Sequence, residues 1–221
     1  MTVYSFPDFP CEDLLPRKPR NRKWRSCRRF LAVALALLPA EAAAQSLPHP
    51  ISRNGTWDIG VWIGEAIGRE DSGSFAEAQI SMAALRVGKV IAGPSGHGWI
   101  RGTLEYGFDL IPVFVTTGTQ TVYGGGFDPI VLKWTMTGTR RFQPFFEAAG
   151  GGVFTTSNVP PGDTSTFNFI PKLGGGVYIY TADDRAMTLG LRYWHLSNAN
   201  LGNKNPAFNG IQLTIGYHWF R

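Results

Sequence analysis

The chain has 221 residues and a formal net charge of +5, but that charge is unevenly distributed. Residues 1–44 hold 8 of the 21 Lys and Arg residues and 4 of the 16 Asp and Glu residues, which leaves 13 basic against 12 acidic side chains in residues 45–221. Residues 45–221 are therefore nearly neutral, so the net charge of the chain is no evidence for a nucleic-acid partner, and none is expected. Both cysteines, Cys11 and Cys27, lie before these residues.

The first segment has the composition of a secretory signal peptide. Residues 17–29 contain eight Lys and Arg residues, an apolar run follows at residues 30–39, and three alanines end at Ala44. The apolar run is too short to cross a bilayer as a helix, which takes ~20 residues. We therefore expect cleavage after Ala44, with residues 1–44 as a removed leader and residues 45–221 as one exported domain. The long stretch ahead of the basic residues suggests that translation starts further downstream.

The remaining residues show the alternation of β-strands. They contain no run of 18 apolar residues, which argues against helical membrane spans. Period-two patterns separated by turn residues predict eight strands, at 56–66, 76–91, 97–110, 122–137, 142–154, 165–181, 186–197 and 210–220. An even number of strands is typical of closed bacterial membrane barrels. The predicted fold class is all-β, an eight-stranded antiparallel transmembrane β-barrel.

The orientation of the strands follows from their two faces and from loop lengths. In the last strand Ile211, Leu213 and Ile215 alternate with Gln212, Thr214 and His218. Apolar residues outside and polar residues inside indicate a barrel in lipid, although the same alternation also suits a soluble lipocalin-like barrel with its faces inverted. The connections after the second, fourth and sixth strands are short, and the other four run to about 9–14 residues, as periplasmic turns and extracellular loops do. Both ends of the barrel domain are therefore expected in the periplasm.

Strand parity also places charged side chains inside the barrel. Eight strands enclose a space that side chains can just fill, and buried charges have to be paired. We therefore expect a paired polar core rather than the alternative of a narrow channel. The expected interior charges are Arg101, Glu105, Lys133, Glu147, Lys172 and Arg192.

The end of the seventh predicted strand carries two residues that could take part in catalysis. His195 and Ser197 are two positions apart, so they project from one face about 6.6 Å apart along the strand. That face is otherwise apolar and faces lipid, where polar groups are costly unless they have a function. Because odd strands run outwards, the pair is expected near the outer leaflet. Trp194 and Trp219 are interpreted as anchors at the membrane interface.

This segment resembles the outer-membrane lipid A 3-O-deacylases, or PagL-like acyloxyacyl hydrolases. Their motif is His-x-Ser-Asn at the end of the seventh strand, a loop with Asn, Pro and Gly, and Gly-Ile-Glu at the start of the last strand. The corresponding segments here are His195–Ala199, Asn205-Pro206 and Asn209–Gln212. Weaker similarity is seen in Gln143–Ala148 and its following glycines, and in Phe167–Phe169 with Gly174–Gly176.

The resemblance implies a cofactor-free ester hydrolase that removes an acyl chain from lipid A of lipopolysaccharide in the outer membrane. It implies Ser197 as nucleophile, His195 as general base, and Asn198 with a backbone N–H near Asn200 as the oxyanion-stabilising groups. The protein would be embedded in the membrane, and a homodimer is left open.

The third catalytic position departs from the family. The family has Glu where this chain has Gln212, which implies Gln212 as the residue that orients His195, without a charge to stabilise the imidazolium. Parity, however, turns Gln212 inward and Asn209 outward, so both stay open as the partner of His195. Diminished activity is therefore a serious alternative. Gln212→Glu is expected to raise the deacylase activity.

Two other classes of function stay open. The first is a non-catalytic small barrel with adhesion, structural or lipid-binding roles, and the second is a soluble ligand-binding barrel. The four histidines, His49, His97, His195 and His218, lack metal-ligand spacing, and no phosphate-binding loop or dinucleotide fingerprint is present. The acyl position that is cleaved does not follow from the sequence.

Overall fold

The computed structural model describes residues 51, 53–70, 78–118, 120–138 and 141–221. The expected leader, its cleavage position after Ala44, Cys11, Cys27 and His49 lie outside the described residues. In the described part of the chain the regular secondary structure is almost entirely β-strand, apart from single-turn 3-10 helices such as η2 (Gly98–Ile100). The same part has no helix that is long and apolar enough to span a membrane.

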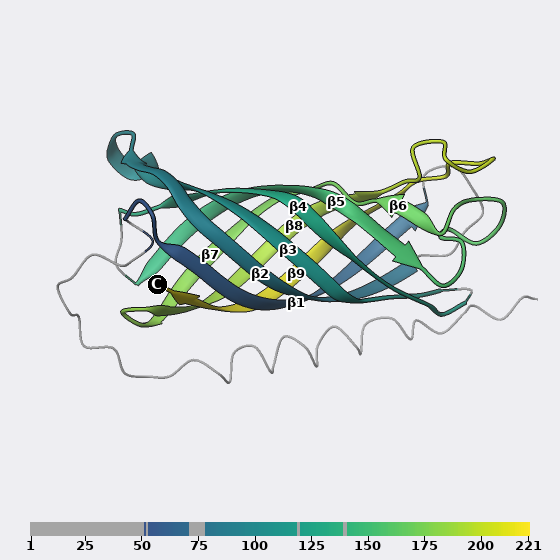
Figure 1. Ribbon diagram of the computed structural model, residues 1–221, viewed down its shortest axis with the longest axis horizontal. Helices are drawn as coiled ribbons and strands as arrows, with labels where there is room; N and C mark the ends of the chain where they lie inside the picture. The colour runs from purple at the N-terminus through teal and green to yellow at the C-terminus, as the bar shows by residue number, and fades with distance from the viewer. Residues whose placement is uncertain (1–50, 52, 71–77, 119, 139–140) are drawn as a thin grey trace, which may run out of the picture. The chain divides into compact units, whose positions relative to one another are not determined.

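Eight of the described strands form a closed antiparallel ring (Figure 1). Their order is β4-β3-β2-β1-β9-β8-β7-β5, and pairing between β4 and β5 closes the ring. The predicted eight-stranded antiparallel barrel is therefore confirmed. The strands are β1 (Trp57–Glu70), β2 (Ala78–Ser95), β3 (Gly102–Thr117), β4 (Val122–Met136), β5 (Phe142–Thr155), β7 (Lys172–Ala182), β8 (Arg185–Leu196) and β9 (Phe208–Phe220).

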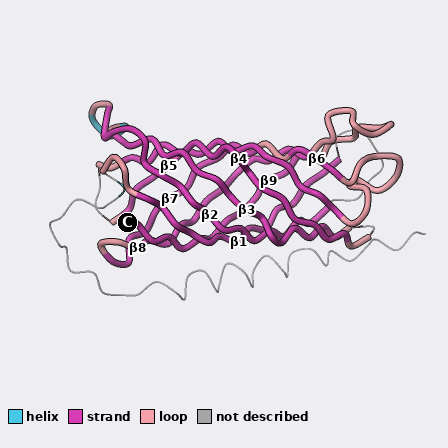
Figure 2. Tube along the Cα trace, viewed as in Figure 1, coloured by secondary structure: helices cyan, strands magenta, loops and turns pink. Residues whose placement is uncertain are grey.

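A ninth, short strand, β6 (Phe167–Phe169), pairs with β5 just ahead of β7 (Figure 2). The sequence predicted one strand over 165–181, and the structure divides it at Ile170 and Pro171. Pro171 has no N–H to donate to a neighbouring strand, which accounts for the break. Its carbonyl still accepts from the His195 N–H at 3.0 Å, so the edge of β8 stays bonded across the interruption.

The bounds of the third strand differ most from the prediction. The sequence predicted 97–110, whereas β3 begins at Gly102 and continues to Thr117. Residues 98–100 form the turn η2 instead. The connection from β3 to β4 is consequently limited to residues 118–121, shorter than the long loop that was expected there.

The outer surface of the ring is apolar. Large side chains such as Ile63, Phe146 and Leu173 are more than 60% exposed, and they alternate with buried neighbours along their strands. A soluble barrel would place this apolar face inward. The lipocalin-like alternative is therefore wrong, and the prediction of a transmembrane barrel is confirmed.

The interior contains the expected charges in ion pairs. Arg86 binds Asp109 through two nitrogens, each 2.6 Å from a carboxylate oxygen, and Glu147 through a third at 2.5 Å. Arg192 approaches Glu147 at 2.9 Å, and Lys172 binds Asp128 at 2.5 Å. These pairs are fully or almost fully buried, which satisfies the requirement that charges in a narrow lumen be compensated.

A second part of the network surrounds Lys133. Its Nζ lies 2.6 Å from the Tyr178 hydroxyl and 3.6 Å from Glu105, and Tyr178 donates to Asp58 at 2.9 Å. His218 contacts the other oxygen of Asp58 at 2.7 Å. Five of the six charges expected inside are therefore there. The placement of Arg101 was wrong, because this residue precedes β3 and is exposed.

The end of the barrel near β6 has an apolar interior. Trp194 and Leu196 of β8 are completely buried there, against a cluster that includes Phe208 and Ile170. Burial of each such side chain stabilises the fold by about 1.5–3 kcal/mol, so the end of β8 is held firmly. The interpretation of Trp194 as an interface anchor is wrong, since its ring points inward, whereas Trp219 faces outward and is partly exposed.

Candidate active site

His195 and Ser197 lie on the outer face at the end of β8. Both are half-buried, and they continue the face that carries the exposed Leu189, Leu191 and Tyr193. On one side His195 pairs with Asn209 of β9. On the other, Ser197 forms a two-bond bridge with Phe169 of β6, with N–O distances of 2.8 and 3.1 Å. The backbone of both residues is therefore fixed by neighbours on two sides.

The side chain of His195 is oriented by Asn209. Nδ1 of His195 lies 2.7 Å from Oδ1 of Asn209. An amide oxygen can only accept, so Nδ1 carries the proton and Nε2 is left with a free lone pair. The hydroxyl of Tyr193 donates to the same oxygen at 2.5 Å. His195 therefore has the tautomer that a general base needs.

Gln212 lies elsewhere, inside the barrel. It is completely buried, and its Nε2 lies 3.4 Å from the sulfur of Met82. β9 pairs with β8 without a bulge from Phe208 to Trp219, so alternation turns position 212 inward and position 209 outward. Of the two partners that the sequence left open for His195, the structure brings Asn209 to the ring and does not bring Gln212.

The hydroxyl of Ser197 is uncommitted among the described residues. It makes no hydrogen bond to any of them, His195 included. The two side chains nevertheless share one strand face.

Asn198 organises the loop that follows Ser197. Its backbone N–H donates to Asn205 Oδ1 at 2.9 Å, its Nδ2 donates to the Lys204 carbonyl at 2.8 Å, and its Oδ1 accepts from the Asn200 N–H at 2.9 Å. Ala199 and Asn200 have positive φ of 51° and 65°, which makes the chain turn sharply here. The Asn200 N–H is thus already donated, whereas Asn198 Nδ2 has a second hydrogen to offer.

A second loop supports this turn. Asn203 donates to both carboxylate oxygens of Asp163, at 3.0 and 3.1 Å, and the Lys204 N–H donates to the Asp163 carbonyl. Gly202 fits closely against the same loop, since a Cβ there would lie 2.5 Å from the Thr164 carbonyl oxygen. The segments 156–166 and 197–207 therefore hold each other beside the site.

Aromatic rings lie next to Ser197 on the side away from Asn209. Phe169, its bridge partner, contacts Phe167 at 5.0 Å between ring centroids, and Phe167 contacts Phe154 at 4.7 Å. Phe154 and Phe169 are 57% and 41% exposed. This arrangement offers an apolar surface directly beside the hydroxyl.

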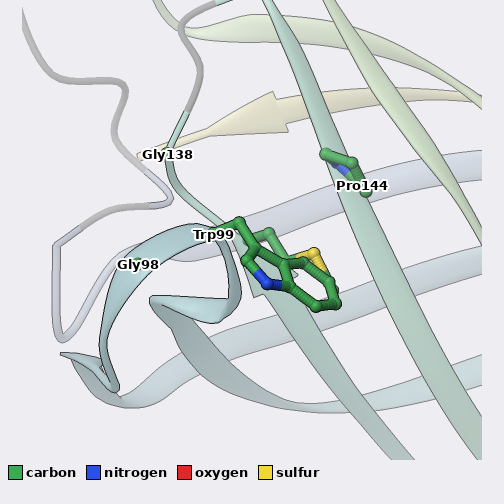
Figure 3. Close-up of a pocket in the computed structure, with 5 residues that line it drawn as sticks. Gly98, Trp99, Gly138 and Pro144 are labelled. Atoms are coloured by element: carbon green, nitrogen blue, oxygen red, sulfur yellow. The ribbon is translucent and has the colours of Figure 1, made fainter.

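A hollow at the other end of the barrel lacks groups that could carry out catalysis. This surface hollow of about 390 Å³ is lined by Gly98, Trp99, Met136, Gly138 and Pro144, with no acid, base or nucleophile among them. Figure 3 shows four of these residues labelled around it. In the described part of the chain no three His, Cys, Asp or Glu side chains are grouped to hold a metal ion.

The closed ring, its apolar outside and its paired interior charges define an eight-stranded transmembrane β-barrel. The family model for lipid A 3-O-deacylase (PagL) matches residues 99–218, more than half of the chain and including every residue of the site. The chain belongs to this family.

Solved structures that are similar to this chain share little sequence identity with it. Neisserial surface protein A (NspA) is 11% identical, with 75% of this chain and 99% of that chain covered and a TM-score of 0.52. The outer membrane enzyme PagL is 21% identical, with 70% and 97% covered and a TM-score of 0.49. A search of curated proteins gives no significant match.

Proposed function

We propose that this protein is an outer-membrane lipid A deacylase that hydrolyses the 3-O-linked acyl ester with Ser197 and His195. The observation that carries the proposal is the contact between His195 Nδ1 and Asn209 Oδ1, two residues from Ser197 on the outer face of the barrel. An acceptor at Nδ1 keeps Nε2 of the histidine available as the base, which is the role that this ring has in a serine hydrolase.

The proposed reaction has two steps. Ser197 Oγ attacks the ester carbonyl carbon while its proton passes to His195 Nε2, and the C–O bond to the sugar then breaks as that proton moves to the leaving alcohol. Water next attacks the acyl-Ser197 ester through the same nitrogen, which releases the fatty acid and restores the hydroxyl. One water is consumed, and one alcohol and one carboxylic acid are formed.

Asn209 takes the third position in this proposal in place of Gln212. It holds the ring in the required tautomer but cannot offset the positive charge that His195 gains. We therefore expect a working enzyme with a low rate.

The negative oxygen of the tetrahedral intermediate needs a donor, and Asn198 is the proposed one. Asn198 is buried and its Nδ2 uses one hydrogen on Lys204, so the second hydrogen reaches the substrate only when the 197–207 loop shifts. Asn200 acts indirectly, because its N–H holds the Asn198 side chain in place.

The membrane context fits the proposed substrate. The site lies at the barrel end that carries the segments 156–166 and 197–207, and export by the expected signal peptide would place that end in the outer leaflet, where lipid A is found. The phenylalanines beside Ser197 provide a surface on which an acyl chain can lie.

The test is the lipid A of cells that produce the protein. The full chain is expressed in a Gram-negative host whose lipid A carries 3-O-linked hydroxyacyl chains, and lipid A is analysed by mass spectrometry. Loss of one hydroxyacyl mass is expected with the native chain and not with Ser197→Ala, at equal amounts of folded barrel. Acyl loss that survives Ser197→Ala would refute the nucleophile, and no loss from either the native chain or Asn209→Asp would favour the non-catalytic barrel.

A further inference from the structure

The side chain of Asn209 has a weakness that a carboxylate does not have. An amide presents oxygen on one side and NH₂ on the other, and rotation by half a turn exchanges them. With oxygen towards His195, the ring carries its proton on Nδ1 and accepts at Nε2. With NH₂ towards His195, the ring must accept at Nδ1 and carry its proton on Nε2, so it cannot take the proton of Ser197.

The orientation of one amide group therefore decides whether the site has a base. In a serine protease, the change from acid to amide at the equivalent position lowers turnover ~10⁴-fold because the wrong tautomer is favoured. A hydrolase that uses Asn at this position needs a second group to hold the amide oxygen towards the histidine.

Tyr193 provides such a group. Its hydroxyl donates to Asn209 Oδ1, the same atom that accepts from His195, and an amide oxygen has two lone pairs for two donors. The phenol hydroxyl is a better donor than acceptor, because its oxygen lone pair is partly delocalised into the ring. A flipped amide would replace this bond with a weaker one, and the flip is disfavoured.

The fold explains how the hydroxyl reaches that atom. Tyr193 and His195 are successive outward residues of β8, and across the strand pair they face Ile211 and Asn209 of β9. Tyr193 and Asn209 are therefore diagonal neighbours, a separation of ~7–8 Å that a long aromatic side chain can span. The ring is 48% exposed on the outer face, so it makes no contribution to the barrel core.

We propose that Tyr193 is a positioning residue that fixes the amide of Asn209 and thereby selects the reactive tautomer of His195. This inference rests on the proposed Ser197 and His195 chemistry. It predicts that the hydroxyl of Tyr193 matters only while position 209 carries an amide.

The kinetic test is a pair of substitutions in two backgrounds. Tyr193→Phe in the native chain should lower kcat roughly 3–10-fold, as expected for one hydrogen bond, with KM for lipid A unchanged. In an Asn209→Asp background, where both oxygens accept and no flip exists, Tyr193→Phe should leave kcat unchanged. Tyr106→Phe is the matched control, since it removes another outward hydroxyl that donates to a carbonyl, at Pro129, far from the site.

A spectroscopic test is independent of turnover. In the full-length protein with ¹⁵N-labelled histidine, at a pH where the ring is neutral, the His195 signal should report the Nδ1–H tautomer, and Tyr193→Phe should raise the Nε2–H fraction. His195→Gln assigns the signal. Equal loss of kcat in both backgrounds, unchanged kcat in Tyr193→Phe, or an unchanged tautomer would overturn the inference. If the native chain and Ser197→Ala are equally inactive, the proposed function fails, and the tautomer measurement still decides the role of Tyr193.

Discussion

Nδ1 of His195 and Oδ1 of Asn209 lie 2.7 Å apart, although the two residues are 14 positions apart in the chain. They are directly opposed on β8 and β9, so the regular antiparallel register brings them together and no special loop conformation is needed. The site is therefore built on two rigid strands, which is where precise geometry is most easily maintained.

Asn209→Asp should increase the rate of deacylation. A carboxylate of the same length keeps the bond to Nδ1, admits one tautomer, and offsets the charge on the imidazolium. The expected gain in kcat is roughly tenfold or more, below the ~10⁴ seen for a buried protease site because this site is partly exposed. Lipid A release is measured in membranes with matched amounts of barrel. A rate that falls instead would show that the neutral amide is required.

Gln212→Glu should leave the rate unchanged, contrary to the expectation from the sequence. The side chain points into the barrel beside Met82 and faces Arg192 across the strand pair. Two nitrogens of Arg192, Nε and Nη1, make no hydrogen bond to the described residues, so a carboxylate at position 212 has a cation nearby. The same lipid A assay, run beside Asn209→Asp, distinguishes the two positions, and a gain at 212 alone would restore the assignment made from the motif.

The fold could be predicted from the sequence because period-two alternation is regular along strands such as β1, β8 and β9. The paired charges followed from the same parity, although Arg86, the centre of the network, was passed over despite its position between the outward Leu85 and Val87. The prediction was wrong where the sequence alternates but the backbone is not a strand. Residues 97–101 alternate like a strand but form a turn, so Arg101 was placed inside.

The candidate site was predicted in part. The motif pointed to His195 and Ser197 and assigned Gln212 as the third member, while parity left Asn209 and Gln212 both open as the partner of His195. The contact from Tyr193 could not be found from the sequence, because a diagonal contact depends on the register between β8 and β9. The loop bonds of Asn198 depend on positive φ at the two residues that follow, and no local pattern indicates those.

Asn198→Ala should lower kcat strongly and leave the free energy of unfolding of the barrel nearly unchanged. The substitution removes the proposed oxyanion donor together with the side-chain bonds to Lys204 and Asn200. Loss of one such donor in a hydrolase typically lowers kcat ~10²–10³-fold. Asn203→Ala is the control, since it cuts the link to Asp163 on the outside of the same loop without touching Asn198. Comparable losses in both variants would mean that loop order, and not the donor, sets the rate.

Arg86→Leu should destabilise the barrel without directly altering the site. Arg86 is 2% exposed and compensates both Asp109 and Glu147, and its removal leaves buried carboxylates without their main partner. Breaking a buried ion pair in this way costs ~3–5 kcal/mol in the free energy of unfolding.

The matched control is Arg185→Leu. Arg185 pairs with Asp184 at 3.4 Å, and both side chains are more than half exposed, so this pair contributes at most ~1 kcal/mol. Urea unfolding in detergent micelles, followed by tryptophan fluorescence, compares the two variants. The kcat of the protein that stays folded should be close to native in both cases, because the ion pairs lie inside the barrel and the site lies on its outer face. If Arg86→Leu unfolds at the same urea concentration as Arg185→Leu, the interior charges are stabilised by something other than the pairs described.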